Sequence, residues 1–585
     1  MKTEPINSVL DTREGFNSHE VSEINIPGLT QTRTPNRSAS MDNVDDNQPS
    51  KGKRSRADKD AKKAKGIIAG TAGDDVLTDT DGNDTIRAGA GNDIISIGSG
   101  NDVVKAGAGH DSVSSSVEEE ADRLRDGGLS TIKLRSGNDK ASLVRGNSRV
   151  FAGKGDDTIR IGNRNNVVRA GNGDDFVHST AGAGASKARR QEASAPLVRR
   201  GENTNKIYLG KGNDEALLEG GDNLIFAGRG DDTVGIGRGN DTVRAGAGDD
   251  LIYSVNGGGG TNTVYVGTGN NEVILESGDN TIAISIGNDT VTTGDGDDFV
   301  YSVRGGGGTN TVKLGGGNNE AYLEGGDNAI TAGAGQDSIG IGTGDDTVKT
   351  GSGDDFVYSV GNVSGSTNNI DLGHGNNEVF LESGSNTIVL GRGNNILTLG
   401  EGDDFIFARP NGGGNNQIKL GDGYDKVFLE RGNHTISGGE GKKEISVGNG
   451  LNEINISGSG DNVIYSVGGG AGRDVVTTGA GDDYIETGAG DDVLDGGLGA
   501  LNTLVGGTGA DIFVLRDSTY NYIEDFALGA DMIQLTGGVS FDELTIYQGG
   551  GDDASDAFIG IDGSIVMQLN NTAAIAIDDV NNFAV

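Results

Sequence analysis

Residues 74–109 read DDVLTDTDG, NDTIRAGAG, NDIISIGSG and NDVVKAGAG, four consecutive units of nine residues that decide the fold. They share the frame x-D-x-U-x-x-G-x-G, in which U is Val, Ile or Leu, and the frame recurs with interruptions to about Val514. One apolar residue between polar neighbours is typical of a short strand with one inward side chain. The following G-x-G tolerates the positive φ of a chain reversal. The sequence therefore predicts an all-β, right-handed parallel β-roll or β-helix, a solenoid of nine-residue half-turns and eighteen-residue coils.

Composition excludes several classes of protein. Lys and Arg number 47 and Asp and Glu 87 in 585 residues, and the net charge of −40 argues against nucleic acid or an anionic membrane as partner. Cys is absent, so disulfides cannot replace a large core. The sequence has no run of eighteen apolar residues, so no transmembrane segment is expected. The first sixteen residues lack the apolar region of a cleaved secretory signal.

Three regions are expected. Residues 1–66 are polar and end in a basic stretch, Lys51 to Lys65, which we interpret as a disordered lead-in, with a tether to an anionic polymer as the alternative. Residues 67–515 hold the repeats. Residues 516–585 lose the nonapeptide and carry apolar strands, including one at Ala574–Ile577, which predict a C-terminal β cap over the last coil.

A longer period is superimposed on the units. Between residues 204 and 472 the blocks measure 57, 48, 58, 48 and 58 residues. Each closes with an overlong unit, around Tyr253, Tyr301, Tyr358, Phe407 and Tyr465. A 48-residue block lacks one half-turn, so we expect its closing loop to leave from the opposite side of the solenoid. Further charged insertions occupy residues 118–128 and 181–202.

The frame resembles the repeat G-G-x-G-x-D-x-U-x of the RTX family over roughly residues 67–515. The resemblance implies a calcium-bound parallel β-roll with many Ca²⁺ ions. One departure is systematic, because the first Gly of the repeat is often Ala, Ile, Leu or Thr here. The residues suit calcium, which prefers six to eight oxygen ligands from carboxylates and carbonyls. Two stacked G-x-G-x-D turns would form a cage about 4.8 Å deep.

The candidate ligands are the Asp residues of the frame. Pairs spaced by eighteen residues are Asp75/Asp93, Asp84/Asp102, Asp93/Asp111, Asp139/Asp157, Asp157/Asp175, Asp214/Asp232, Asp232/Asp250, Asp337/Asp355 and Asp474/Asp492. A second rank, next to Asn or an insertion, comprises Asp241, Asp289, Asp298, Asp346, Asp404, Asp425, Asp483 and Asp511.

Asn replaces this Asp in many units, and a neutral amide is a poor calcium ligand. The positions are Asn223, Asn262, Asn271, Asn280, Asn310, Asn319, Asn328, Asn368, Asn377, Asn386 and Asn395. There Asp and Asn serve as turn formers, and stacked amides can hydrogen-bond in a ladder along the coil. The sequence therefore predicts bands rich and poor in calcium.

Calcium is expected to control folding. Stacked carboxylates without metal repel each other by roughly 0.9 kcal/mol per pair even in water. Glycine adds entropy to the unfolded chain. We therefore expect the chain to be mostly unfolded in a calcium-poor cytosol and to fold outside the cell. The last residues, 582–585, resemble the uncleaved signal of type I secretion substrates.

No catalytic constellation is visible. The sequence has no H-E-x-x-H, no G-x-S-x-G and no Cys nucleophile. We expect a secreted, non-enzymatic calcium-binding protein with a structural or adhesive role at the cell surface or in a matrix. Its expected partners are calcium, type I secretion machinery, and either acidic surface polysaccharide or further copies of the chain. The alternatives are a lyase or epimerase acting on polysaccharide through outward tyrosines, and a relative of RTX toxins.

Overall fold

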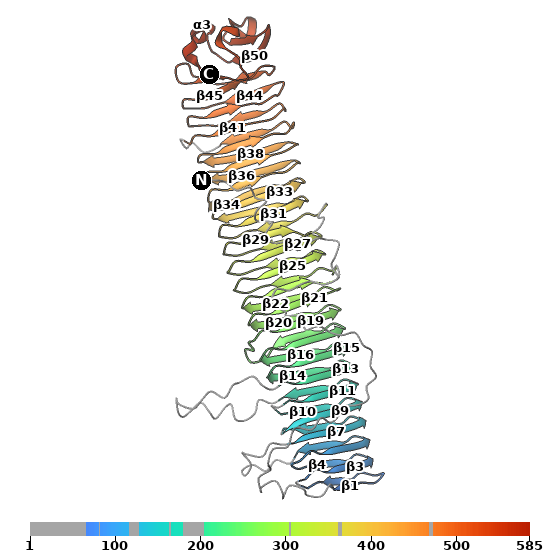
Figure 1. Cartoon of the computed structure of the whole chain (residues 1–585). Coiled ribbons are helices and arrows are strands. Elements are labelled where there is room, and N and C mark those ends of the chain that lie inside the picture. Colours follow the sequence, from blue (N-terminus) through green and yellow to red (C-terminus); the bar gives the residue numbers. More distant parts are fainter. Residues whose placement is uncertain are drawn as a thin grey trace, which may run out of the picture. The chain divides into compact units, whose positions relative to one another are not determined.

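A computed structural model describes residues 66–80, 82–115, 128–144, 146–162, 165–179, 204–303, 306–360, 365–466 and 472–584. The basic N-terminal stretch lies outside the described residues, as do the charged insertions except for Gly128. Residues 64–585 form one compact unit. Within it, strands alternate between two sheets that run side by side along a solenoid (Figure 1).

Sheet A contains the odd-numbered strands except β49. They are β1 (Ile67–Ala69), β3 (Thr85–Ala90), β5 (Val103–Ala108), β7 (Leu129–Ser136), β9 (Asn147–Lys154), β11 (Val167–Asn172), β13 (Lys206–Lys211), β15 (Leu224–Arg229), β17 (Thr242–Ala247), β19 (Thr263–Thr268), β21 (Thr281–Ile284), β23 (Phe299–Ser302), β25 (Glu320–Gly325), β27 (Ser338–Thr343), β29 (Phe356–Ser359), β31 (Glu378–Ser383), β33 (Ile396–Glu401), β35 (Gln417–Lys419), β37 (Thr435–Gly438), β39 (Glu453–Ile456), β41 (Val475–Thr477), β43 (Val493–Asp495), β45 (Ile512–Leu515), β47 (Met532–Leu535) and β51 (Phe583–Ala584).

Sheet B contains the even-numbered strands and the final hairpins. They are β2 (Val76–Thr78), β4 (Ile94–Ile97), β6 (Ser112–Ser115), β8 (Lys140–Leu143), β10 (Thr158–Ile161), β12 (Phe176–Ser179), β14 (Glu215–Gly220), β16 (Thr233–Arg238), β18 (Leu251–Ser254), β20 (Glu272–Ser277), β22 (Thr290–Asp295), β24 (Thr311–Lys313), β26 (Ala329–Thr331), β28 (Thr347–Lys349), β30 (Asn369–Asp371), β32 (Thr387–Arg392), β34 (Phe405–Gly413), β36 (Asp425–Arg431), β38 (Lys443–Asn449), β40 (Val463–Ser466), β42 (Tyr484–Glu486), β44 (Asn502–Val505), β46 (Asn521–Ile523), β48 (Leu544–Gln548), β49 (Ala557–Ile561) and β50 (Ser564–Leu569).

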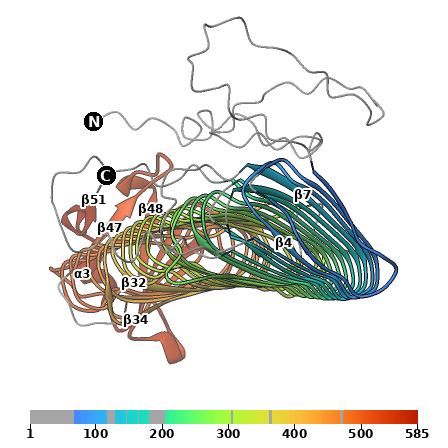
Figure 2. The same cartoon turned by 90° about the horizontal axis from the view of Figure 1, so that it is seen from below.

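Each strand up to β45 pairs in parallel with the strand two places further along the chain. Ile86 of β3 lies opposite Val104 of β5, and Ile95 of β4 lies opposite Val113 of β6, both at a spacing of eighteen residues. Seen from one end, the coils therefore overlie one another (Figure 2). The parallel β-roll with an eighteen-residue coil is confirmed.

Two rows of side chains from each sheet fill the interior, where the frame predicts one. Ile86 at the U position is fully buried, and so is Ala88 two residues later. Residues i and i+2 of a strand share a face, so the sixth position of the unit also points inward. This explains the departure from the RTX repeat, because a Gly there would leave the second row empty. The second row includes Ile97, Ala106, Leu134, Leu143, Ile161, Leu209, Leu218, Ile236, Leu275, Leu323, Leu381 and Leu399.

The turn glycines allow the coils to stack closely. Gly107 has a φ of +134°, and a Cβ placed on it would lie 1.7 Å from the carbonyl oxygen of Gly89 in the coil before. Any larger residue would push the two coils apart. Close stacking of turn on turn therefore depends on glycine at this position.

The overlong units leave from both sides, as the block lengths predict. The unit near Tyr253 belongs to β18 in sheet B, and the unit near Tyr301 belongs to β23 in sheet A. The next one stays in sheet A with β29, and the two after it return to sheet B with β34 and β40. Each 48-residue block thus moves its closing loop to the other sheet.

The C-terminal residues cover the last coil. Strands β48, β49 and β50 form antiparallel hairpins, and β50 pairs in parallel with β46. Residues Ala574–Ile577 form a turn of helix, α3, so the strand predicted there is wrong. Ala574 and Ile577 are buried at a helical spacing of three residues, which a strand would not place on one side. Three single turns of 3-10 helix complete the cap, η2 (Phe541–Glu543), η3 (Gly551–Asp553) and η4 (Val580–Asn582). None of the helices in the described part of the chain has the length and apolar character needed to span a bilayer.

Candidate metal sites

The second residue of each unit lies at the turn before its strand and is buried, except for Asp75, which is partly exposed. We call the residues that precede the strands of sheet A column A, and those that precede the strands of sheet B column B. Column B begins with an unbroken run of aspartates, Asp75, Asp93, Asp111, Asp139, Asp157, Asp175, Asp214, Asp232 and Asp250. Column A begins with Asp84 and Asp102 and continues with Ser130, Ser148 and Asn166.

The structure joins aspartate pairs that the insertions separate in sequence. The backbone N–H of Asp111 donates to Oδ1 of Asp139 at 2.7 Å across the first insertion. The N–H of Asp175 donates to Oδ1 of Asp214, also at 2.7 Å, across the second. Spacing alone missed these two links because the inserted residues hide the period. Column B is therefore continuous from Asp75 to Asp250.

The remaining predicted aspartates lie in shorter groups. Asp337 and Asp355 are linked in column A, and Asp404 and Asp425 in column B, by the same backbone-to-carboxylate bond. Near the C-terminus the run Asp474, Asp492 and Asp511 continues to Asp531, which the sequence analysis missed because the repeat frame breaks there. The single aspartates Asp241, Asp289, Asp298, Asp346 and Asp483 each follow an Asn.

From Asp93 to Asp250, one carboxylate oxygen of each aspartate in column B has no hydrogen-bond partner. At a typical step, Oδ1 of Asp157 accepts the N–H of Asp139 at 2.9 Å, and Oδ2 of Asp157 is buried without a donor. The unpaired oxygens in column B up to residue 250 are Oδ2 of Asp93, Asp111, Asp139, Asp157, Asp175, Asp214, Asp232 and Asp250. A buried charged oxygen without a partner is costly. The column thus holds a line of oxygens that need a cation or a proton.

Burial changes the acidity of these groups. Loss of solvation, followed by repulsion from neighbouring carboxylates, raises the pKa of Asp157, Asp175 and Asp232 to about 7. Loss of solvation, again the largest cause, raises the pKa of Asp139 and Asp250 to about 6. Near neutral pH the metal-free column therefore retains part of its protons. A divalent cation would replace those protons and remove the repulsion.

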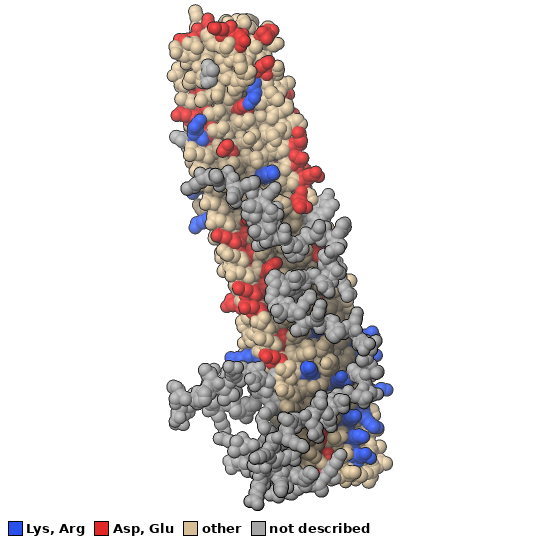
Figure 3. Space-filling model, viewed as in Figure 1, with Lys and Arg blue, Asp and Glu red and all other residues tan. Residues whose placement is uncertain are grey.

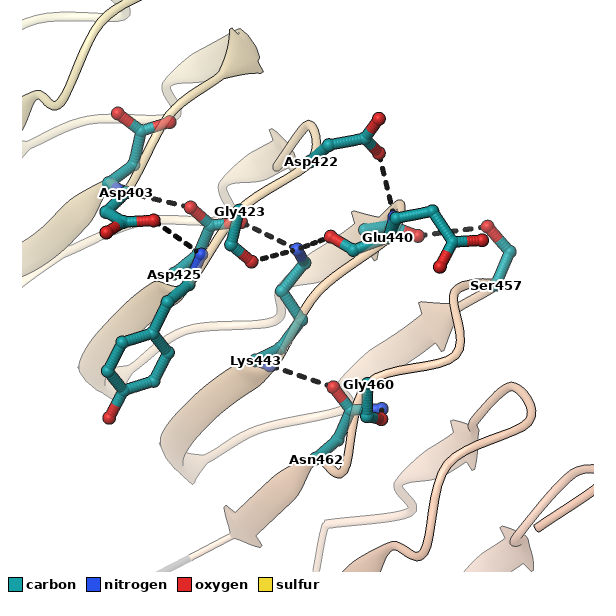
Figure 4. A network of polar contacts seen from close by, with 12 residues as sticks. Asp403, Asp422, Gly423, Asp425, Glu440, Lys443, Ser457, Gly460 and Asn462 are labelled. Atoms are coloured by element: carbon teal, nitrogen blue, oxygen red, sulfur yellow. Dashed lines mark hydrogen bonds and ion pairs between the residues drawn. The ribbon is translucent and has the colours of Figure 1, made fainter.

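One step of column B contains its own cation. The residue after Asp425 in the column is Lys443, whose side chain is 0% exposed. Its Nζ lies 2.9 Å from Oδ2 of Asp425 and donates to the carbonyl oxygens of Gly423 and Glu440, both at 2.8 Å (Figure 4). An ammonium group is thus held by a carboxylate and two turn carbonyls, the oxygen types that calcium prefers. The space between two stacked turns therefore fits a cation. Lys443 occupies the Asp position of the frame, so its place in column B could have been predicted from the sequence.

The asparagines are satisfied without a cation. Nδ2 of Asn223 donates to Oδ1 of Asp241 at 2.7 Å and to the carbonyl of Gly221 at 2.9 Å. Asn328 makes the corresponding bonds to Asp346 and Gly326, at 2.9 and 2.8 Å. Both asparagines also accept an amide bond from the coil before, from Asn205 at 2.7 Å and from Asn310 at 2.8 Å, which confirms the hydrogen-bonded ladder predicted for the amides in these coils.

The first coils hold a cluster of a different shape. Carboxylate oxygens of Asp79, Asp84 and Asp102 lie within 4.8 Å of one another. Burial opposes ionisation of Asp84, but the hydroxyl and N–H of Thr80 donate to its Oδ2, and the pKa of Asp84 is lowered overall. Asp79 occupies the sixth position of its unit, where other units carry an apolar residue, and the frame did not identify it as a ligand.

The outward tyrosines cover neighbouring glycines. Tyr253 lies opposite Gly235 and Tyr358 opposite Gly340, and in each case the ring occupies the space of the missing side chain. Tyr301 is only 6% exposed. These contacts give the aromatic rings a packing role on the coil.

One family comparison matches the chain, whereas no curated protein does. The family is described as the RTX calcium-binding nonapeptide repeat, and its matches together span more than half of the chain. They cover residues 69–104, 98–116, 135–163, 151–184, 201–234, 237–254, 255–283, 285–302, 304–339, 342–359, 368–409, 411–442 and 468–500. All of column B from Asp75 to Asp250 lies within these matches.

Proposed function

Since the chain belongs to the RTX calcium-binding nonapeptide repeat family, we propose that its calcium ions occupy the Asp-to-Asp steps of the two columns. The observation that carries this proposal is the line of buried, unpartnered Oδ2 atoms in column B. Each ion would supply the positive charge that these oxygens lack.

The ammonium of Lys443 indicates which oxygens would hold an ion. It contacts the carbonyl two residues before Asp425 and the carbonyl three residues before its own position. At the step from Asp157 to Asp175, the equivalent positions are Gly155 and Asn172. The N–H of Gly155 donates to the carbonyl of Asn172, as the N–H of Gly423 does to that of Glu440. The two steps therefore share their backbone arrangement.

Calcium bound in this way would stabilise the folded solenoid outside the cell, where the ion is abundant. Proteins with these repeats are typically secreted, and we propose export by type I secretion machinery followed by folding on calcium. The stiffened solenoid would serve a structural or adhesive role at the cell surface or in a matrix. No step of this role requires the protein to catalyse a reaction.

Calorimetric titration of the EDTA-stripped full chain with calcium, followed by far-UV circular dichroism, tests calcium-coupled folding. We expect many bound ions and a gain of strand signal with calcium, and little gain with magnesium at the same concentration. A stripped protein with unchanged dichroism and unchanged heat resistance would contradict the proposal. For the surface role, washing producing cells with EGTA should release the protein, as measured by immunoblot, whereas a wash with calcium should not.

A further inference from the structure

Basic residues gather on the outer face of sheet A in the N-terminal coils. Strands β3 to β17 of this sheet contain no Asp or Glu. Their Lys and Arg residues are Arg87, Lys105, Lys133, Arg135, Arg149, Lys154, Arg169, Lys206, Lys211, Arg229 and Arg244. We call this surface, together with its aromatic residues, the basic strip. In Figure 3 the blue side chains lie mainly over these lower coils, and red side chains prevail above them. The strip is notable in a chain with a net charge of −40.

The strip is organised by strand register. The fifth residues of successive sheet A units stand opposite one another, at the spacing of about 4.8 Å between neighbouring strands. In order they are Arg87, Lys105, Lys133, Phe151, Arg169, Tyr208, Phe226, Arg244 and Tyr265. Cations and aromatic rings thus form one continuous row along the solenoid.

Cation–π contacts hold this row in place. The guanidinium of Arg169 lies 5.7 Å from the ring of Phe151 and 5.5 Å from that of Tyr208. Arg244 lies in the same way between Phe226 and Tyr265, at 5.7 and 5.1 Å. The rings of Tyr208 and Phe226 stack on each other at 5.0 Å. The guanidinium groups of Arg169 and Arg244 are therefore held in place before any ligand arrives, which lowers the entropy cost of binding.

Within the described part of the chain, no acidic side chain neutralises the positive charge of the strip. Among the described residues, none of its Lys and Arg forms an ion pair with Asp or Glu. The neighbouring surfaces differ. Further along sheet A the outward residues include Glu320, Glu324, Glu378 and Glu382. Sheet B in the same coils as the strip carries both signs of charge, for example Arg160 and Glu215.

We propose that the basic strip binds an acidic polysaccharide laid along the solenoid axis. A linear polyanion can contact successive cations of the row, and charge complementarity favours it over a neutral glycan. Single-stranded nucleic acid fits less well, because base stacking needs free ring faces and neighbouring side chains already contact the faces of Tyr208 and Phe226. The choice of partner rests on the proposed surface role. The strip itself is separate from the calcium columns.

Dextran sulfate, with neutral dextran of the same backbone as control, is the probe. Binding to the calcium-saturated full chain is measured by calorimetry at about 50 and about 200 mM salt. We expect dextran sulfate to bind, to weaken as salt rises, and to bind better than single-stranded or duplex DNA of equal charge. Neutral dextran should not bind.

The test variant is Arg87→Gln, Lys105→Gln and Lys133→Gln combined. Its matched control is Lys313→Gln, Lys349→Gln and Lys419→Gln, three exposed lysines at the same position of the unit outside the strip. We expect affinity for dextran sulfate to fall about tenfold or more in the first variant and to stay within about twofold in the second. Equal loss in both variants, no loss in either, or preference for DNA would overturn the proposal.

Calcium titration of the same samples separates this inference from the proposed function. Both variants should bind as many calcium ions as the unmodified chain. If calcium binding is normal and the strip variant still holds dextran sulfate, the strip proposal alone fails. If the chain binds no calcium, the proposed function fails, whatever the polymer does.

Discussion

Two stretches of column B share one backbone arrangement and differ in the proportion of carboxylate and amide side chains. From Asp75 to Asp250 every coil contributes a carboxylate, whereas from Asn271 to Asn386 amides outnumber carboxylates. The backbone bond is the same in both, since the N–H of Asp157 donates to Asp175 as the N–H of Asn328 does to Asp346. The difference lies in the second side-chain atom, which is an unpartnered oxygen from Asp93 to Asp250 and a bonded NH₂ at asparagines such as Asn328. The need for metal is therefore set by the side chain and not by the fold.

Removal of calcium should separate the two stretches most strongly. We expect EDTA to abolish amide protection in β4 to β18 and to leave more protection in β24 to β32, because each saturated site adds about 2.7 kcal/mol at a free calcium level of a hundred times Kd. Hydrogen exchange with mass spectrometry measures this for each peptide. Equal loss of protection along the whole solenoid would mean that the amide ladder does not stand alone.

Lys443 tests whether a built-in cation replaces the metal. Lys443→Met would leave Oδ2 of Asp425 buried without its partner, and we expect a loss of about 3–5 kcal/mol in the free energy of unfolding of this region, with calcium absent. The control is Lys426→Met, at a half-exposed pair with Glu444, where water screens the two charges and the expected loss is much smaller. Urea unfolding measures both. Similar losses in the two variants would argue against a special role for Lys443.

Exchange of single residues between the stretches should move the metal requirement with them. Asp157→Asn can form the amide bond to Asp175, so we expect fewer calcium ions and a gain of about 1–2 kcal/mol in the metal-free protein. Asn271→Asp joins Asp250 to Asp289 and should have the opposite effects. Calcium titration and metal-free urea unfolding report both. A change of the same sign in the two variants would contradict the comparison.

The effect of pH on the metal-free protein is expected to be smaller. The folded pKa of Asp157 and Asp175 is raised to about 7, from an ordinary value of 3.8, so the folded state holds more protons than the unfolded state between these values. Stability therefore falls as pH rises through this window. Far-UV circular dichroism of metal-free protein should therefore show less strand signal at pH 7.5 than at pH 5.5. Saturating calcium should remove or reverse the trend, and a strand signal that rises with pH without metal would contradict it.

The sequence alone predicted the structure wherever the nine-residue repeat runs without an insertion. It predicted the eighteen-residue coil, the pairing of Asp139 with Asp157, and the change of side of the loops. It did not predict contacts between residues that only the folded chain brings together. Insertions hid the links from Asp111 to Asp139 and from Asp175 to Asp214, and the inward sixth position became clear only when the strand faces were known.

The basic strip illustrates the same limit. Its residues occur in every second unit, so units of sheet B, which carry both signs of charge, interrupt them in the sequence. Cations such as Arg169 and rings such as Tyr208, 39 residues further on, meet only after an insertion has been looped out. Lys443 was different, because it occupies a frame position that the sequence shows directly.

Each unit of nine residues makes half a coil, so odd and even numbers of units have different effects on the structure that follows them. Loss or duplication of one unit would send every later strand to the opposite sheet, so that loops and charged surfaces downstream would exchange sides. Loss of two units would only shorten the molecule by one coil. The 48-residue blocks have already made this exchange twice, around β23 and β34. Gene rearrangements of odd and even numbers of units thus have different consequences for what each side of the protein displays.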